Sequence, residues 1–260
     1  MDRIWGRLLD LLFPPRCQVC GRLHGEALCP ECRAGIEWIA LPYCERCGRA
    51  VDPRAHAAPR CAECRRAGPL GGARACGHHV GVLQGAVVRL KYSGRTRLAT
   101  PLGRMLACRL TQEASAPAPL PLPSVAAIIP VPLHPRRRAE RGFDQAELLA
   151  QVCGEETRIP VWTGLLERDR DTEQQTKLQG RRRLENVRGA FSARPVPRLA
   201  GEALLLVDDV YTTGATLREC ARALRRAGAA AVYGLTVTRS APDWLRSRDL
   251  PPPDDPLPRR

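Results

Sequence analysis

Two adjacent carboxylates and a run of hydroxyl groups follow a short apolar stretch in the last quarter of the sequence. The apolar stretch covers residues 204–207, and the polar residues after it include Asp208, Asp209, Thr212, Thr213 and Thr216. Four consecutive apolar residues fit a strand that is covered on both faces, as in a parallel sheet. Beyond Gly214, apolar residues recur at helical spacing until Gly228, where a helix would stop. The segment predicts a strand, a polar turn and a helix.

The residue types in this turn suit a phosphorylated sugar. Backbone N–H groups at the start of a helix bind a phosphate, and Gly214 lets the backbone approach it closely. Asp208 and Asp209 repel a phosphate, but they accept hydrogen bonds from vicinal sugar hydroxyls or order water around Mg²⁺. A 5-phosphorylated ribose meets both demands. The alternative, a helix merely capped by Thr213 or Thr216, needs one such residue and leaves the others without a role.

Four Cys-x-x-Cys pairs supply a second kind of chemistry within the first 64 residues. They are Cys17/Cys20, Cys29/Cys32, Cys44/Cys47 and Cys61/Cys64. The order CQVCGR, CPECR, CERCGR, CAECR indicates an internal duplication in which each half offers four thiolates, enough for one closed structural Zn²⁺ site. We therefore expect two zinc ions, although an interleaved pairing of the first pair with the third stays open. Disulfides are disfavoured because no export signal is visible, and a redox motif would be single.

The chain around these motifs resembles a known family. Residues 206–216 resemble the motif of type I phosphoribosyltransferases that binds phosphoribosyl pyrophosphate (PRPP). Residues 131–135 and 141–146 are similar to the central block of the ComF family of competence-associated proteins. The same similarity, in order and approximate spacing, holds for Thr172, Gln175, Leu178, Arg183, Asn186 and Phe191. The resemblance runs from the first cysteines to about Arg239, with one departure: Asp144 stands where the family usually has asparagine, so an acceptor replaces a donor.

The resemblance implies a fold and a set of roles. The fold is α/β, a parallel-sheet type I phosphoribosyltransferase fold with a small N-terminal double zinc ribbon. Asp208 and Asp209 would hold the ribose of PRPP, with Mg²⁺. The 5-phosphate would bind Thr212, Thr213, Gly214, Ala215 and Thr216. Residues 131–137 would receive pyrophosphate, and Arg137 and Arg141 are its best cationic candidates.

Three further basic residues are less clearly assigned. Lys177 and Arg183 fall where the fold carries a mobile catalytic loop and could stabilise departing pyrophosphate there. A solvated charged loop is the alternative. Lys91, which with Lys177 makes up all the lysine in the chain, could reach a phosphate or lie on the surface. Replacing Asp208 and Asp209 by asparagine is expected to weaken PRPP binding with little effect on stability, because adjacent carboxylates repel each other.

Charge and composition bound the partners. The 260 residues carry a formal net charge of +14, which favours a polyanionic partner. Arginine clusters at residues 136–141 and 181–188 are a candidate surface for single-stranded DNA, with binding that weakens as salt rises. Aromatic residues make up only 4%, so extended base-stacking platforms are not expected. The resemblance adds DNA uptake in natural transformation and a DNA-translocating ATPase as a partner.

The sequence divides into three parts. We expect residues 1–72 to form an amphipathic helix and the zinc module, residues 76–240 the phosphoribosyltransferase-like domain, and residues 241–260 a disordered tail. Residues 68–72 are expected to be a flexible seam, and the isolated Cys76, Cys108, Cys153 and Cys220 to lie in the core. No membrane span is visible, so a cytoplasmic location is expected, with peripheral contact at the inner membrane face as the weaker interpretation.

Two functions remain open at this point. One is a PRPP-binding protein that serves DNA uptake. The other is an active Mg²⁺-dependent phosphoribosyltransferase whose acceptor is unidentified. The sequence shows no recognisable hood to receive a base, so ligand binding is better supported than turnover.

Overall fold

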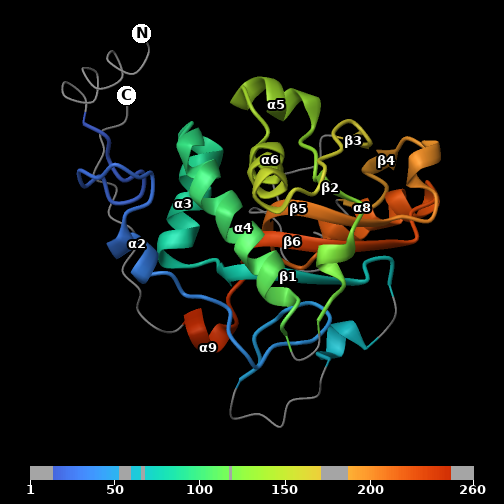
Figure 1. Ribbon diagram of the computed structural model, residues 1–260, viewed down its shortest axis with the longest axis horizontal. Coiled ribbons are helices and arrows are strands. Elements are labelled where there is room, and N and C mark those ends of the chain that lie inside the picture. Colours follow the sequence, from blue (N-terminus) through green and yellow to red (C-terminus); the bar gives the residue numbers. More distant parts are fainter. Residues whose placement is uncertain (1–13, 53–59, 66–67, 117–118, 171–186, 247–260) are drawn as a thin grey trace.

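The computed structural model describes residues 14–52, 60–65, 68–116, 119–170 and 187–246. Its centre is a parallel sheet with the strand order β1-β6-β5-β2 (Figure 1). The strands are β1 (Gly72–His78), β2 (Ala127–Pro130), β5 (Ala203–Tyr211) and β6 (Ala231–Arg239). The predicted parallel α/β architecture is therefore confirmed.

Helices cover both faces of this sheet. One face carries α3 (Gly81–Tyr92), α4 (Ala99–Glu113) and α6 (Gln145–Thr157), and the other carries α8 (Ala215–Arg226) with the hairpin of β3 (Leu166–Arg168) and β4 (Phe191–Ala193). The shorter helices are α2 (Pro30–Ala34), α5 (Pro135–Arg141), α9 (Asp243–Arg246) and the 3₁₀ turns Ala62–Cys64, Thr96–Leu98, Leu122–Ser124 and Pro197–Leu199. Figure 1 shows α5 projecting beyond the sheet, above α6.

The apolar run that precedes the carboxylates lies in the middle of this sandwich. Leu205 and Val207 pack into the cluster under α4 and α6, whereas Leu204 and Leu206 pack into the cluster under α8. All four side chains are fully buried. A strand covered on both faces is what a continuous apolar run predicts, and the structure contains that strand.

The structure corrects the sequence interpretation at three points. Strand β5 does not end at Val207 but runs on to Tyr211, because β6 pairs beside it as far as Arg239, so both carboxylates lie in the strand. The expected flexible seam ends inside the sheet, since Gly72 is the first residue of β1 and a Cβ there would lie 2.8 Å from the Arg46 carbonyl oxygen. Cys108 is exposed on α4, whereas Cys76, Cys153 and Cys220 are buried as expected.

The expected N-terminal helix lies outside the described residues. So does the tail from residue 247 onward. Residues of the predicted tail that are described include α9, where Leu245 is 3% exposed. No helix in the described part of the chain is long and apolar enough to cross a membrane.

The cysteine-rich segment divides into two zinc modules that dock on β1, an edge strand of the sheet. The first zinc module (residues 16–39) pairs with the end of β1: the Ile39 amide donates to the Cys76 carbonyl at 3.1 Å, and the His78 amide donates to the Glu37 carbonyl at 2.8 Å. The second zinc module (residues 42–52 and 60–65) meets the beginning of β1, where the Ala73 amide donates to the Arg46 carbonyl at 2.7 Å. The modules thus extend the sheet through backbone hydrogen bonds.

A buried ion cluster joins the second zinc module to α4. Glu113 pairs with Arg74 at 2.7 Å and with Arg109 at 3.3 Å, and the Glu113 side chain is 0% exposed. Its carboxylate also accepts from the Leu120 amide at 3.0 Å. Both guanidinium groups lie over the ring of Tyr43, at 5.1 and 5.3 Å from its centroid. One carboxylate therefore balances two cations beneath the second zinc module.

We predict that Glu113→Gln destabilises the protein strongly. The substitution keeps the side-chain volume but leaves Arg74 and Arg109 without their carboxylate, and breaking a buried pair costs about 3–5 kcal/mol. Denaturant unfolding measures the loss. The matched control is Glu140→Gln, which breaks an exposed pair with Arg136 and should cost no more than about 1 kcal/mol. Equal losses in the two variants would contradict a structural role for the cluster.

Candidate functional site

The predicted sugar-binding residues lie where β5 extends beyond its neighbour. Strand β2 ends at Pro130, opposite Val207, and the last contact there is the Val131 amide donating to the Val207 carbonyl at 2.9 Å. Residues 208–211 continue, paired with β6 alone among the strands described. In open α/β sheets, ligands bind in such a crevice at the carboxyl ends of the strands.

Asp209 projects toward α3 and is held by Lys91. Its side chain is 4% exposed, and its carboxylate forms an ion pair with the Lys91 ammonium, whose side chain is 20% exposed. Burial lowers the pKa of Lys91 to about 8, although the nearby Asp208 charge acts in the opposite direction. Lys91 therefore neither lies on the surface nor projects freely toward a ligand.

Asp208 projects to the other face of β5, because successive side chains alternate along a strand. Burial raises its pKa to about 7, and Lys91 opposes the shift without cancelling it. On this face lies Cys220 of α8, whose pKa is raised by burial and, second, by the nearby Asp208 charge. The Oδ1 atom of Asp208 accepts from the Asp209 amide at 2.8 Å. The two carboxylates are thus in different environments, and the expectation that both can be neutralised without cost does not hold for Asp209.

The turn after β5 is packed around Tyr211. Gly214 has a φ of +72° and a Cβ there would lie 2.2 Å from the Tyr211 hydroxyl oxygen, so only glycine fits. Gly214 also occupies the N-cap position directly before α8. No side chain in the described residues caps that helix, apart from a 3.4 Å contact from the Ala215 amide to the Thr213 hydroxyl. Thr216 lies in the first turn of α8. The cap interpretation thus has one weak contact in its favour.

Arg239 connects this turn to the second zinc module. It lies at the end of β6 and is 3% exposed. Its guanidinium stacks on the Tyr211 ring at 4.1 Å and donates to the Cys47 carbonyl oxygen at 2.7 Å. The zinc-binding loop, Arg239, Tyr211 and Gly214 therefore form one continuous series of contacts.

The loop after β2 is fixed by Asp144. This residue caps α6 by accepting from the Ala146 and Glu147 amides at 2.9 and 3.3 Å. Its second oxygen accepts from the Leu133 amide at 2.8 Å, which anchors the loop predicted to receive pyrophosphate. All three contacts require an acceptor, so a carboxylate satisfies them without needing the amide that the family usually has here.

Arg141 lies at the same end of the sheet. Its guanidinium stacks on Tyr92 at 5.3 Å, donates to Gln145, and its charge contributes to the lowered pKa of Lys91. Arg137 is close enough that its charge contributes, after burial, to lowering the pKa of Arg141. Arg137 and Arg141 therefore lie close to each other, and Arg141 lies close to Lys91, the partner of Asp209. Lys177 and Arg183 lie outside the described residues, and their assignment stays a prediction.

Sequence reasoning assigned no role to three residues at this site: His79, Tyr92 and Arg239. The Nδ1 atom of His79 lies 2.9 Å from the Thr238 hydroxyl, and burial together with the Lys91 charge lowers the pKa of His79 to about 4. Tyr92 and Arg239 carry no local motif. Their positions as the last residues of α3 and β6 become informative only when the strand order is known.

The eight paired cysteines form two tetrads in chain order, which resolves the pairing that spacing left open. Cys17, Cys20, Cys29 and Cys32 form one, and Cys44, Cys47, Cys61 and Cys64 the other, with the sulfur atoms of each within 4.8 Å of one another. The Sγ distances include 3.8, 3.6 and 3.8 Å. A tetrahedron with Zn–S bonds of about 2.3 Å has edges of about 3.8 Å, so the sulfur atoms fit zinc. None of these cysteines forms a disulfide.

Comparison with known proteins gives the family. Residues 8–65 match the double zinc ribbon domain, and residues 142–250 match the phosphoribosyl transferase domain. Competence protein F of Haemophilus influenzae is 33% identical over 231 residues, which cover 83% of this chain and 93% of that protein. The chain belongs to the ComF family.

Other relatives of this ComF-family chain carry related names. The DNA utilization protein YhgH of Escherichia coli is 32% identical over 219 residues, which cover 83% of this chain and 86% of that protein. Competence protein ComFC of Bacillus subtilis is 37% identical over 114 residues, which cover 44% of each. The predicted family, the zinc ribbon and the phosphoribosyltransferase domain are thereby confirmed.

We predict that the two carboxylates of this ComF-family protein affect stability in opposite directions. The raised pKa of Asp208 means that the folded protein holds its proton more tightly than the unfolded chain. Its contribution to stability is therefore present at low pH and lost as the pH rises through about 7. Asp208→Asn should raise the melting temperature at pH 8, and by much less at pH 5, where only the unfolded chain has begun to lose the proton.

Asp209→Asn should instead lower the stability at both pH values, because it leaves the partly buried Lys91 unpaired, at a cost of about 1–3 kcal/mol. Melting both variants at pH 5 and pH 8 makes the comparison. Shifts of the same sign and pH dependence in the two variants would contradict the different environments.

We also predict two zinc ions per chain, with different consequences for losing each. Cys17→Ser should lose one zinc and leave the 212–214 turn protected from hydrogen exchange, whereas Cys44→Ser should lose the other and loosen that turn through Arg239. Elemental analysis and exchange mass spectrometry measure these effects. The control is Cys108→Ser, an exposed cysteine outside both tetrads, which should keep two zinc ions. Disulfide-bonded tetrads in the purified protein would refute the prediction.

Proposed function

We propose that this ComF-family protein binds PRPP at the crevice formed by the end of β5, the turn before α8 and the loop after β2. The single observation that carries the proposal is the extension of β5 past β2. It places two carboxylates next to a glycine-containing turn at the start of a helix. A 5-phosphate would bind the amides that begin α8, which the described side chains leave largely uncapped.

The ribose would lie across the end of β5. Asp208 and Asp209 face opposite sides of the strand, so a ligand that contacts both has to cross it. Asp209 already forms an ion pair with the Lys91 ammonium. Asp208 is therefore the carboxylate with more free acceptor positions for hydrogen bonds from sugar hydroxyls. Hydrogen bonds to a charged acceptor contribute about 1.5–3 kcal/mol each, enough to dominate recognition of the ribose.

The pyrophosphate would bind on the α5 side of the crevice. Arg137 and Arg141 lie there, and Asp144 holds the intervening loop through the Leu133 amide. An arginine fork holds phosphate oxygens in a bidentate manner, which suits a diphosphate. Mg²⁺ fits this donor set because it prefers carboxylate and phosphate oxygens, and Asp208 and Asp209 would hold its water shell. The ion would supply charge neutralisation for the diphosphate.

Binding is proposed ahead of turnover. The Lys177 and Arg183 side chains, which would serve a departing pyrophosphate, lie outside the described residues, and the structure identifies no acceptor. An active Mg²⁺-dependent phosphoribosyltransferase remains the alternative function. Release of pyrophosphate from PRPP on addition of a nucleobase or DNA would favour that alternative.

Calorimetric titration with PRPP and Mg²⁺ tests the proposal. Because Asp208 has a pKa of about 7, it has to lose a proton to accept the ribose hydroxyls, so affinity should increase by up to about tenfold per pH unit below 7 and level off above it. The ligand's own phosphates titrate too, so the control is Asp208→Asn. This variant should bind PRPP at least about tenfold more weakly at pH 8. The pH dependence of its affinity should lack the one proton that Asp208 releases. Unchanged affinity in a well-folded variant would overturn the proposal.

A second candidate function is binding of single-stranded DNA. Two observations favour it: the net charge of +14, and the relatives named for DNA utilization. Parts of the predicted arginine surface are engaged in exposed ion pairs, as with Arg136 and Glu140 or Arg138 and Glu147. Such pairs contribute little and exchange readily for phosphate. A DNA-translocating ATPase stays a proposed partner, without a surface assigned to it.

A further inference from the structure

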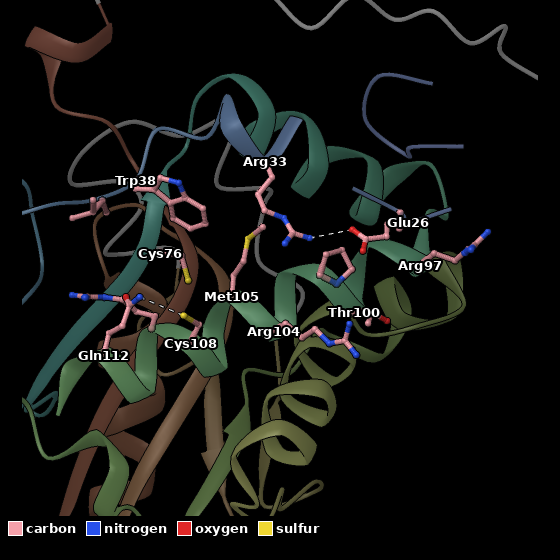
Figure 2. Close-up of a pocket in the computed structure, with 14 residues that line it drawn as sticks. Glu26, Arg33, Trp38, Cys76, Arg97, Thr100, Arg104, Met105, Cys108 and Gln112 are labelled. Atoms are coloured by element: carbon pink, nitrogen blue, oxygen red, sulfur yellow. Dashed lines mark hydrogen bonds and ion pairs between the residues drawn. The ribbon is translucent and has the colours of Figure 1, made fainter. Parts of the chain in front are cut away.

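A cavity of about 910 Å³ lies between the first zinc module and α4, away from the residues of the PRPP crevice. Trp38 and Arg33 come from the zinc module, and Arg97, Arg104 and Met105 come from the start of α4 and the turn before it. Figure 2 shows Trp38 at one end of the cavity and Arg97 at the other, with Met105 between them. The volume is within the range of pockets that enclose a small ligand.

The backbone of Trp38 is held at the cavity wall by pairing with β1. Trp38 forms a bridge to Gly77 at the edge of β1, and the flanking hydrogen bonds involve Glu37 and Ile39. A Cβ on Gly77 would lie 2.8 Å from the Glu37 carbonyl oxygen, so this close approach requires glycine. Despite the fixed backbone, the side chain of Trp38 stays 47% exposed. A positioned aromatic ring is thus left open to solvent.

The cavity is basic. Among the described lining residues, Glu26 supplies the single carboxylate, against four arginines, of which Arg109 is paired with the buried Glu113. Arg33 pairs with Glu26 at 3.3 Å and Arg104 with Glu156 at 2.9 Å, and both pairs are exposed. The side chain of Arg97 forms no hydrogen bond or ion pair with the part of the chain that the structure describes. Exposed pairs contribute at most about 1 kcal/mol, so an incoming phosphate can replace these carboxylates.

We infer that this cavity binds a base of single-stranded nucleic acid, stacked on Trp38, with the adjoining phosphates on Arg97 and Arg104. An open aromatic face accepts any base, and flanking arginines follow the backbone of a single strand. A duplex keeps its bases stacked inside the double helix and cannot place one of them against Trp38 in the cavity. The inference rests on the proposed DNA binding and identifies where a base is held; it does not depend on the PRPP site.

Fluorescence anisotropy of a labelled oligothymidylate, at low salt and with the full chain, tests the inference. Trp38→Ala should weaken binding roughly five- to 150-fold, the range that stacking of one base supplies, whereas Trp38→Phe keeps a ring and should retain most of the affinity. Arg97→Ala should lower the slope of log affinity against log salt by about one. The matched control is Val88→Ala, a 43% exposed apolar residue that does not line the cavity.

The outcomes distinguish the DNA-binding function from the cavity as the place where a base is held. Absence of binding by the unaltered protein at low salt would overturn both the DNA candidate and the cavity. Binding that is unaffected by Trp38→Ala and Arg97→Ala would overturn the cavity alone. Equal affinity for a duplex, or complete competition by thymidine monophosphate at equal nucleotide concentration, would overturn the assignment to a single strand. Unchanged PRPP affinity and melting temperature show that a variant is folded, and Arg97→Ala tests the cavity even if Trp38→Ala unfolds.

Discussion

The structure depends on how β1 is paired along its outer side. This strand has β6 on one side, and on the other it forms backbone hydrogen bonds with both zinc modules. Gly72 and Gly77 permit these contacts, because a side chain at either position would meet the carbonyl oxygen of Arg46 or Glu37. The metal sites are consequently not appendages. They order two loops whose backbones complete the sheet.

The same arrangement links the zinc modules to the ligand crevice. Arg239 extends from the end of β6 to the Cys47 carbonyl and supports Tyr211, against which Gly214 turns. On the face of β5 toward α3, Lys91 neutralises Asp209 and lowers the free-energy cost of burying that carboxylate. The end of β5 is therefore positioned by side chains from α3 and β6, and Arg239 is in turn held by a backbone carbonyl of the second zinc module. A ligand there would meet a preformed set of charges.

Sequence patterns predicted the parts of the protein that depend on local order. The apolar run at residues 204–207 marked the central strand, and cysteine spacing marked two tetrads, because a zinc knuckle and a buried strand are short-range structures. The length of β5 was not predictable in this way. Pairing with β6 decides that the strand continues to Tyr211, and polar residues such as Asp208 carry no signal for it.

Long-range contacts were the other class that sequence could not supply. Arg239 and Cys47 are 192 residues apart, and Lys91 meets Asp209 only after the strands are ordered. Cys108 was assigned to the core by residue type, yet it lies on the outer face of α4, since helix burial depends on which face packs. The tetrad pairing also needed the fold, because linker length permits two solutions.

The close pairing of β1 has a consequence for solubility. An unpaired edge strand is a template for association with another chain, and proteins commonly cover such edges. Here the zinc modules are the cover. A chain that loses its metal, or that is cut before Gly72, would present a bare strand edge together with the buried Arg74, and would be prone to aggregate. Oxidation of the cysteines would then first reduce the amount of soluble protein, while the residues of the crevice itself remain chemically intact.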